Sequence, residues 1–294
     1  MTTTPPFGRA LCAMITPFTE TGVLDLDGAQ RLAAHLISEG CDGLVLSGTT
    51  GESPTTTDAE KSALVRAVRD AVGPTTPLLT GVGTADTRHS IHLAAEAAES
   101  GATGVLLTAP YYSRPPQDAV AAHLRDVADA SELPVMLYDI PSRTGTRIAP
   151  DTLLTLAGHP RVLAVKDCSY DFLAAQKVIS RTDLAYYAGC DEHNLALYAV
   201  GGTGYVSTVS NVAARQVRAV LDLFDAGDTT AAAKAQQRLI PLTELMMASN
   251  LPGTVTAKAL LADLGLPSGP VRRPLLDADR ETTKALRAAY EECG

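Results

Sequence analysis

The chain has 294 residues, a net charge of −9 and an apolar content of 46 %, which allows one large α/β domain or two smaller ones. The acidic balance argues against nucleic acid or an anionic membrane as the main partner, because both attract clustered lysine and arginine. No apolar run reaches the ~18 residues of a membrane-spanning helix, and the amino terminus lacks the features of a signal peptide.

Short apolar runs alternate along the chain with amphipathic stretches, which predicts alternating strands and helices. The predicted strands are 10–15, 43–47, 77–81, 104–109, 134–139, 162–166, 184–189 and 203–208. Several are apolar at consecutive positions, as expected of parallel strands buried on both faces. The predicted helices between and after them are 28–39, one beginning at 57–60, 87–100, 117–130, 150–157, 171–180, 191–200 and 211–225.

Eight strands that are each followed by a helix predict an α/β protein with a (β/α)8 (TIM) barrel. The rival is a doubly wound open sheet, which normally has fewer units and a glycine-rich first turn. The run Gly81-Val82-Gly83 lacks the third glycine of a dinucleotide fingerprint, so we favour the barrel.

Three further helices are predicted after the eighth unit, at 229–249, 254–264 and 280–291, with a proline-rich loop at 267–274. We therefore predict a barrel over residues 1–225 and, over 226–294, a C-terminal helical extension packed on that barrel.

The cysteines are Cys12, Cys41, Cys168, Cys190 and Cys293. They form no C-x-x-C pair, and their number is odd. In a chain of this size, such usage is typical of a reducing compartment, so we expect a cytoplasmic protein.

In a barrel of this kind the active site lies at the C-terminal ends of the strands. Polar side chains gather at these ends, at 47–52, 110–112, 138–145 and 166. Lys166 is the least expected of them, because it follows the buried run 163–165. In one interpretation Lys166 pairs with Asp167 or extends its ammonium to solvent. In the other, burial lowers the pKa of its amine, which can then attack a carbonyl. Neighbouring residues on a strand point to opposite faces, which weakens the pairing with Asp167.

Tyr138 is either a core tyrosine or a proton carrier, and Thr49 either forms a turn or links Tyr138 to solvent. Arg143 follows Pro141 and Ser142 in a predicted loop, and it is either a solvated surface charge or a fork for a substrate carboxylate. The histidines show no H-x-x-x-H spacing and no G-x-S-x-G motif is present, so we expect neither a metal site nor a serine hydrolase.

Five motifs agree in order and spacing with a known family. GTTGES (48–53), PYYSRPP (110–116), LYDIPSRTG (137–145), VKD (165–167) and GYVS (204–207) resemble those of the 4-hydroxy-tetrahydrodipicolinate (dihydrodipicolinate) synthase family. This family belongs to a superfamily that contains N-acetylneuraminate lyase and other class I pyruvate aldolases. The resemblance implies the barrel, a C-terminal helical region and a Schiff-base mechanism without a metal or organic cofactor.

The resemblance also assigns catalytic roles. Lys166 is expected to form an imine with pyruvate, and Tyr138 to transfer protons at that imine. Thr49 is expected to bridge Tyr138 to Tyr112, which reaches in from a neighbouring subunit. A site completed across an interface implies an oligomer, usually a homotetramer built as a dimer of dimers.

Four residues are expected to bind substrate. Thr50 holds the pyruvate carboxylate, and Arg143 holds the carboxylate of the second substrate, aspartate semialdehyde. Gly189 and Val206 offer main-chain carbonyls. Another pyruvate-dependent aldolase or lyase and a non-catalytic keto-acid-binding paralogue are the alternatives; the Thr49–Thr50 pair and Arg143 favour the synthase.

Several positions depart from the family pattern. Asp139 stands where asparagine is common, and Cys190 where aspartate is common. The positions that meet the inhibitor in lysine-regulated members correspond to Asp58, Lys61, Ala85 and His89. Because a glutamate is lost at His89 and Lys61 adds positive charge, we predict little inhibition by lysine.

Overall fold

Eight parallel strands close into a barrel in this computed structural model, which describes residues 5–247 and 250–293. Each strand pairs with the next in sequence, and the last pairs with the first. The strands are β1 (Ala10–Ala13), β2 (Gly43–Leu46), β3 (Leu78–Gly81), β4 (Gly104–Thr108), β5 (Val135–Asp139), β6 (Val162–Asp167), β7 (Ala185–Ala188) and β8 (Gly204–Ser207). All eight predicted strands are confirmed, and the closed order excludes the doubly wound sheet.

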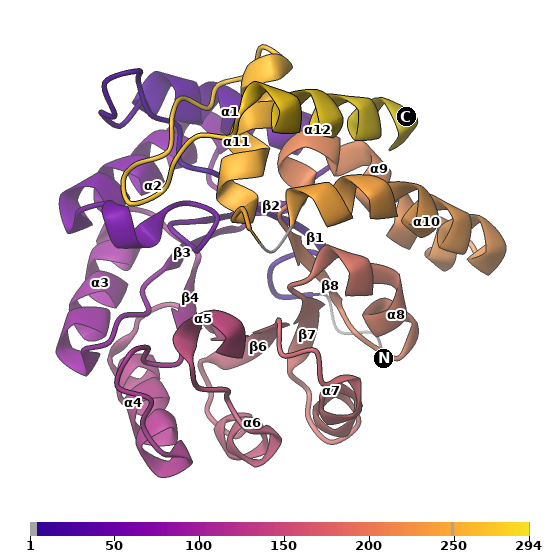
Figure 1. Ribbon diagram of the computed structural model, residues 1–294. Coiled ribbons are helices and arrows are strands. Elements are labelled where there is room, and N and C mark those ends of the chain that lie inside the picture. The colour runs from indigo at the N-terminus through magenta and orange to yellow at the C-terminus, as the bar shows by residue number, and fades with distance from the viewer. Residues whose placement is uncertain (1–4, 248–249, 294) are drawn as a thin grey trace.

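A ring of helices surrounds the strands, as the view along the barrel shows (Figure 1). Its members are α1 (Leu26–Ser38), α2 (Asp58–Val72), α3 (Thr87–Glu99), α4 (Gln117–Ala130), α6 (Pro150–Leu156), α7 (Phe172–Ile179), α8 (Asn194–Ala199) and α9 (Ser210–Asp225). Two predictions need correction. The segment around Arg143 is a short helix, α5 (Pro141–Thr144), and not a loop, and the helix predicted at 191–200 begins as a 3₁₀ turn, η2 (Asp191–His193).

The apolar side chains form two clusters. The outer cluster lies between the strands and the helix ring, and the inner cluster fills the barrel. The inner cluster includes Leu11, Val45, Leu79, Leu106 and Met136, which are almost completely buried. The barrel is therefore a packed core, and space for a ligand remains only at its ends.

The helix that follows the 47–56 loop begins at a defined cap. The Thr57 side chain accepts a hydrogen bond from the Glu60 main-chain N–H, and the Glu60 carboxylate accepts one from the Thr57 main-chain N–H. This reciprocal capping box fixes the start of α2, preceded by the 3₁₀ turn η1 (Ser53–Thr55). It anchors one end of the loop that carries Thr49 and Thr50.

The C-terminal region consists of α10 (Thr229–Met246), α11 (Gly253–Asp263) and α12 (Arg280–Cys293). These helices pack against one another and against α9 (Figure 1). Residues 248–249 of the predicted helix 229–249 lie outside the described residues. The division of the chain at residue 225 remains a prediction.

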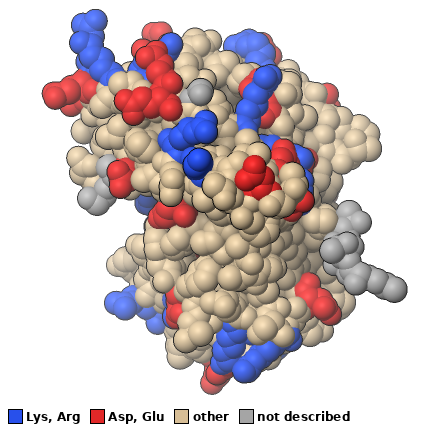
Figure 2. All heavy atoms as spheres, turned by 90° about the vertical axis from the view of Figure 1, so that its right-hand side faces the viewer, with Lys and Arg blue, Asp and Glu red and all other residues tan. Residues whose placement is uncertain are grey.

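The surface carries mixed charge. On the face seen in Figure 2, basic and acidic side chains lie next to one another and alternate with uncharged surface. This differs from the clustered basic surface of a nucleic-acid-binding protein. Within residues 5–247 and 250–293, no helix combines the length and apolar character that a membrane crossing requires.

Candidate active site

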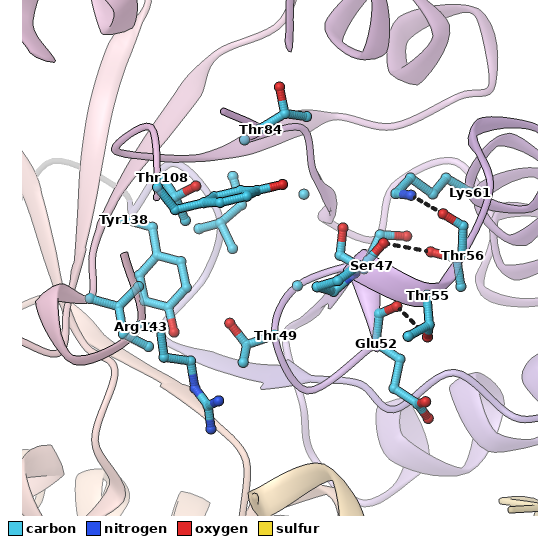
Figure 3. Close-up of a pocket in the computed structure, with 18 of the residues that line it drawn as sticks. Ser47, Thr49, Glu52, Thr55, Thr56, Lys61, Thr84, Thr108, Tyr138 and Arg143 are labelled. Atoms are coloured by element: carbon cyan, nitrogen blue, oxygen red, sulfur yellow. Dashed lines mark hydrogen bonds between the residues drawn. The ribbon is translucent and has the colours of Figure 1, made fainter. Parts of the chain in front are cut away.

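A cavity of about 500 Å³ opens at the C-terminal ends of β2 to β5. Thr49, Tyr138 and Arg143 line it, as Figure 3 shows. Lys166, Thr50 and Val206 are buried at the same end of the barrel. Together with Gly189, which follows β7, seven of the eight predicted site residues therefore gather at the strand ends. The eighth, Tyr112, does not line the cavity.

Lys166 lies inside the barrel, where its side chain is 5 % exposed. It pairs in register with Tyr138 on β5 and with Tyr187 on β7. Its Nζ lies 4.4 Å from the centre of the Tyr138 ring. Burial lowers the pKa of the Lys166 amine, and the nearby Cys168, Cys190 and Asp191 oppose that effect.

The pairing of Lys166 with Asp167 is not found. The Asp167 carboxylate points to the outer face, where it accepts hydrogen bonds from the Tyr186 hydroxyl (2.8 Å) and the Ser169 N–H (2.6 Å). No carboxylate lies within ion-pair distance of Lys166 in the described part of the chain. A lysine that is buried, without a salt-bridge partner and lowered in pKa is suited to be a nucleophilic amine.

Tyr138 lies beside this amine and is also buried. Burial raises the pKa of its hydroxyl, Cys168 adds to the rise, and the Thr49 hydroxyl lowers the pKa. In Figure 3 the hydroxyl of Thr49 points toward the hydroxyl end of the Tyr138 ring. Two hydroxyls that face each other in this way are suited to proton transfer.

The loop that carries Thr49 and Thr50 is held in a strained shape. Ser47 and Glu52, at its two ends, have left-handed φ angles of 50° and 54°. A β-carbon on Gly51 would lie 2.9 Å from the Ser47 main-chain nitrogen, so only glycine fits there. Strain of this kind persists only where the surroundings hold it, and it is frequent at functional sites.

Contacts with the far C-terminal region hold the loop. The Thr254 hydroxyl lies 3.3 and 3.2 Å from the carbonyl oxygens of Thr49 and Thr50. The Thr50 hydroxyl is 3.1 Å from that of Thr208. Our sequence reasoning missed Thr208 and Thr254, because no local pattern links residues so distant in the chain.

The carboxylate of Glu52 is buried with the ammonium of Lys258, at 2.5 Å. Sequence reasoning missed this pair as well. The sequence shows Glu52 in the GTTGES motif, but no residue near Glu52 in the sequence indicates that Lys258 is its partner.

Arg143 lies on α5 with its side chain exposed along the cavity. Figure 3 shows Arg143 on the same side of the cavity as Tyr138, with its guanidinium extended past the Tyr138 ring. Among the described residues it forms no salt bridge. A free guanidinium at a cavity wall is suited to bind a ligand carboxylate.

The main chain comes close to the buried amine at Gly189. A β-carbon there would lie 2.4 Å from the Cys168 sulfur and 3.0 Å from Cε of Lys166, so a side chain fits only if these groups move. Val206, on β8, is fully buried in the inner cluster.

Tyr112 is 94 % exposed and has a left-handed φ of 71°, while its neighbour Tyr111 lines the cavity. One copy of the chain therefore does not bring Tyr112 to Thr49.

The cavity extends away from Lys166 toward α2 and α3, where Asp58, Lys61 and His89 line it. His89 Nε2 is 2.9 Å from an Asp58 oxygen, and Lys61 Nζ donates to the Thr56 carbonyl at 2.6 Å. Burial lowers the pKa of Lys61.

The described residues contain no group of three or more histidine, cysteine, aspartate or glutamate side chains placed to hold a metal ion. The site consists of an amine, hydroxyls, a guanidinium and main-chain groups.

This fold and site are those of a (β/α)8 barrel enzyme. The model of the dihydrodipicolinate synthetase family matches residues 6–293, and the chain belongs to that family. It is 71 % identical to 4-hydroxy-tetrahydrodipicolinate synthase 1 of Streptomyces coelicolor, over 98 % of this chain and 94 % of that protein. It is 52 % identical to the 4-hydroxy-tetrahydrodipicolinate synthase of Acidothermus cellulolyticus, over 98 % and 93 % of the two chains.

Comparison with solved structures leads to the same family. A dihydrodipicolinate synthase from Bacillus anthracis superimposes with a TM-score of 0.94 at 36 % identity, covering 97 % of this chain and 98 % of that one. A dihydrodipicolinate synthase from Cyanidioschyzon merolae with lysine bound gives the same TM-score and identity, covering 98 % and 99 %. The predicted family resemblance is confirmed, and the chain is an enzyme of the 4-hydroxy-tetrahydrodipicolinate synthase type.

Proposed function

We propose that this enzyme condenses pyruvate with L-aspartate 4-semialdehyde to 4-hydroxy-tetrahydrodipicolinate, a step toward diaminopimelate and lysine, through a Schiff base on Lys166. One observation carries the proposal: the buried Lys166 amine has no salt-bridge partner among the described residues and lies against the Tyr138 ring. The reaction needs such an amine, because only the uncharged form attacks a carbonyl.

The amine attacks C2 of pyruvate, and loss of water gives the imine. Loss of a methyl proton gives the enamine, whose carbon attacks the aldehyde of the second substrate. The amino group of that substrate then attacks C2, closes the ring and releases Lys166. Tyr138 donates and accepts protons at the imine, because the centre of its ring lies 4.4 Å from the amine and its hydroxyl faces Thr49.

Substrate binding divides among the remaining residues. Thr50, in the strained loop, takes the pyruvate carboxylate, and the main-chain carbonyls of Gly189 and Val206 line the pocket around the imine. Arg143 takes the carboxylate of the aldehyde, since its guanidinium borders the open part of the cavity.

Tyr112 completes the proton path from a second copy of the chain. Its 94 % exposure in one copy, next to cavity-lining Tyr111, supports this role. A second surface beside α7 borders a hollow of about 720 Å³, where the exposed apolar side chains Leu173 (78 %) and Val200 (36 %) lie among charged ones. Two such surfaces support a homotetramer arranged as a dimer of dimers, and we place the enzyme in the cytoplasm.

Lysine is expected to inhibit weakly. In the arm of the cavity beside α2 and α3, Asp58 already pairs with His89, and the Lys61 amine repels a second cation. Strong inhibition at sub-millimolar lysine in the purified enzyme contradicts this expectation.

The test combines turnover with trapping. Purified enzyme is assayed with both substrates, coupled to a reductase that consumes the product, and loss of NADPH is followed. Separately, pyruvate and borohydride are added and the reduced adduct is located by peptide mass spectrometry. We expect turnover and an adduct on Lys166, and no adduct in Lys166→Ala. Lys61→Ala is the matched control, because this lysine also lines the cavity, and it should trap pyruvate normally.

Arg143→Ala should raise KM for the aldehyde and leave pyruvate trapping nearly unchanged. Trapping without turnover would favour another pyruvate-dependent aldolase or lyase, and the search would move to other aldehydes. A folded enzyme that traps no pyruvate would favour the non-catalytic paralogue.

A further inference from the structure

Two cysteines lie beside the buried amine and have no role in the reaction described above. Cys168 follows β6 and Cys190 follows β7, and both are buried, at 6 % and 7 % exposure. Both belong to the apolar cluster inside the barrel, together with Tyr138. They are therefore on the same side of the sheet as the proposed site.

The strand register brings the two cysteines next to each other. Asp167 pairs with Ala188, so Cys168 stands opposite Gly189 and one step from Cys190. The Gly189 N–H donates to the Asp167 carbonyl at 2.8 Å, which continues the pairing to this point. With strands about 4.8 Å apart and a rise of about 3.3 Å per residue, diagonal neighbours have α-carbons roughly 6 Å apart. That separation is within the range of disulfides.

Gly189 has no side chain, which leaves room for the cysteine side chains beside it. Its missing β-carbon would lie 2.4 Å from the Cys168 sulfur, so this sulfur sits directly on the glycine backbone. The Cys168 thiol also lies 3.9 Å from the Tyr138 hydroxyl, to which it donates. Tyr138 lines the cavity, so a small oxidant in the cavity is separated from the Cys168 sulfur only by the Tyr138 side chain.

The electrostatics favour one of the two thiols as the nucleophile. The neighbouring Cys190 thiol and the Lys166 amine lower the pKa of Cys168, against the effect of burial. The contact with Cys168 and burial raise the pKa of Cys190. Cys168 is thus the thiol that loses its proton more readily, and Cys190 is the thiol that reacts after it.

We propose that Cys168 and Cys190 form an oxidisable dithiol that a peroxide converts to a disulfide, and that this disulfide disables Lys166. The Cys168 thiolate attacks one oxygen of hydrogen peroxide; the O–O bond breaks, and the leaving hydroxide takes up a proton to become water. The sulfur of Cys190 then attacks the sulfenic sulfur of Cys168. The S–O bond breaks, the Cys190 proton leaves with the oxygen as a second water, and two electrons have passed from the sulfurs to the peroxide.

The crosslink acts on the site through Gly189. When Cys190 bonds to Cys168, the adjoining Gly189 backbone moves. Lys166 packs against this backbone: its Cε would lie only 3.0 Å from a β-carbon placed on Gly189. The Tyr138 hydroxyl also loses its thiol donor. A displacement of about 1 Å at a reacting group is enough to lower a rate by roughly two orders of magnitude.

The experiment treats the reduced, full-length enzyme with hydrogen peroxide and maps its peptides under non-reducing conditions. We expect a linked pair of peptides containing Cys168 and Cys190, lighter by two hydrogen atoms, and we expect dithiothreitol to release them. Pyruvate trapping on Lys166, measured here with cyanoborohydride because it spares disulfides, should fall roughly tenfold or more with the same time course and recover with dithiothreitol. In Cys168→Ser and Cys190→Ser, each compared with its own untreated form, trapping should resist peroxide, whereas Cys12→Ser should behave like the parent.

Absence of the linked peptides, or equal inactivation of both serine variants, overturns the proposal. A disulfide that forms without loss of trapping overturns its effect on Lys166. That effect rests on the proposed function, whereas the disulfide does not. If the reduced enzyme traps no pyruvate, the proposed function fails and the peptide map still decides the disulfide.

Discussion

The buried ion pair between Glu52 and Lys258 yields the sharpest prediction about stability. Its two side chains are only 1 % and 2 % exposed, and the charged atoms are 2.5 Å apart. At an effective dielectric constant of about 20, the gross attraction is roughly 6–7 kcal/mol, and desolvation offsets much of it. Removing one partner leaves the other charge buried, which costs about 3–5 kcal/mol.

The two single variants differ in what they leave behind. In Lys258→Met the Glu52 carboxylate keeps only a hydrogen bond from the Arg272 N–H, at 2.8 Å. In Glu52→Gln the ammonium keeps the Pro270 carbonyl at 2.9 Å and the face of the Phe18 ring at 4.1 Å. We therefore expect Lys258→Met to be the more destabilising, and the double variant to be less destabilised than the sum of the singles.

Urea denaturation of the parent, both singles and the double variant measures this coupling. The matched control is the exposed pair of Lys177 and Asp151, whose charged atoms are 2.6 Å apart with side chains 36 % and 82 % exposed. Lys177→Met should cost no more than about 1 kcal/mol. Additive single effects at Glu52 and Lys258, or a cost similar to that of the control, would refute the reasoning.

Two further predictions concern residues beside the site. Burial raises the pKa of the Asp139 carboxyl from 3.8 to about 7. Between these two values the folded chain keeps a proton on Asp139 that the unfolded chain has lost. The free energy of unfolding therefore falls as the pH rises from about 4 to 7. Asp139→Asn should remove about 2–3 kcal/mol of that fall between pH 5 and pH 8, measured by urea denaturation; an unchanged slope argues against it. Gly189→Ala places a β-carbon 2.4 Å from the Cys168 sulfur and 3.0 Å from Cε of Lys166, so it should cost about 1–3 kcal/mol and reduce pyruvate trapping. Gly158→Ala, whose β-carbon meets its nearest atom at 3.7 Å, is the control, and equal effects of the two would contradict the steric account.

The barrel could be predicted because its signal is repeated and local. Parallel strands buried on both faces are apolar at consecutive positions, and eight such runs are visible in the sequence. The same regularity located the site, since polar residues that follow apolar runs must gather at one end of a barrel.

Short elements escaped prediction for a physical reason. The helix that carries Arg143 has only one turn, too short for a periodic pattern, although Pro141 at its start and Gly145 at its left-handed end are ordinary helix signals. The predicted helix at 191–200 begins as a 3₁₀ turn because the Asp191 carboxylate is drawn inward. It accepts hydrogen bonds from Ser207 and from the main-chain N–H groups after β8.

The contacts that shape the 47–56 loop cannot be predicted from local sequence. Lys258 is separated from Glu52 by most of the barrel sequence, and neither residue has a neighbour that identifies the other. A buried glutamate in a loop indicates that some partner exists, because an isolated buried carboxylate is too costly. Only the fold identifies which cation supplies it.

The C-terminal region is consequently part of the site and not a separate appendage to it. Thr254 donates to the carbonyls of Thr49 and Thr50 in the 47–56 loop, Lys258 pairs with Glu52, and Arg272 binds the Glu60 carboxylate through two nitrogens. Arg272 also lowers the pKa of Glu60 to about 2, so this contact stays ionised throughout the neutral range. Residues of the same region, including Pro252 and Leu275, form a wall of the cavity itself. Because the loop between β2 and α2 has left-handed residues at both ends, it depends on these contacts to keep its shape. The barrel strands carry Lys166 and Tyr138, and contacts from the C-terminal region hold the loop with Thr49 and Thr50 beside them.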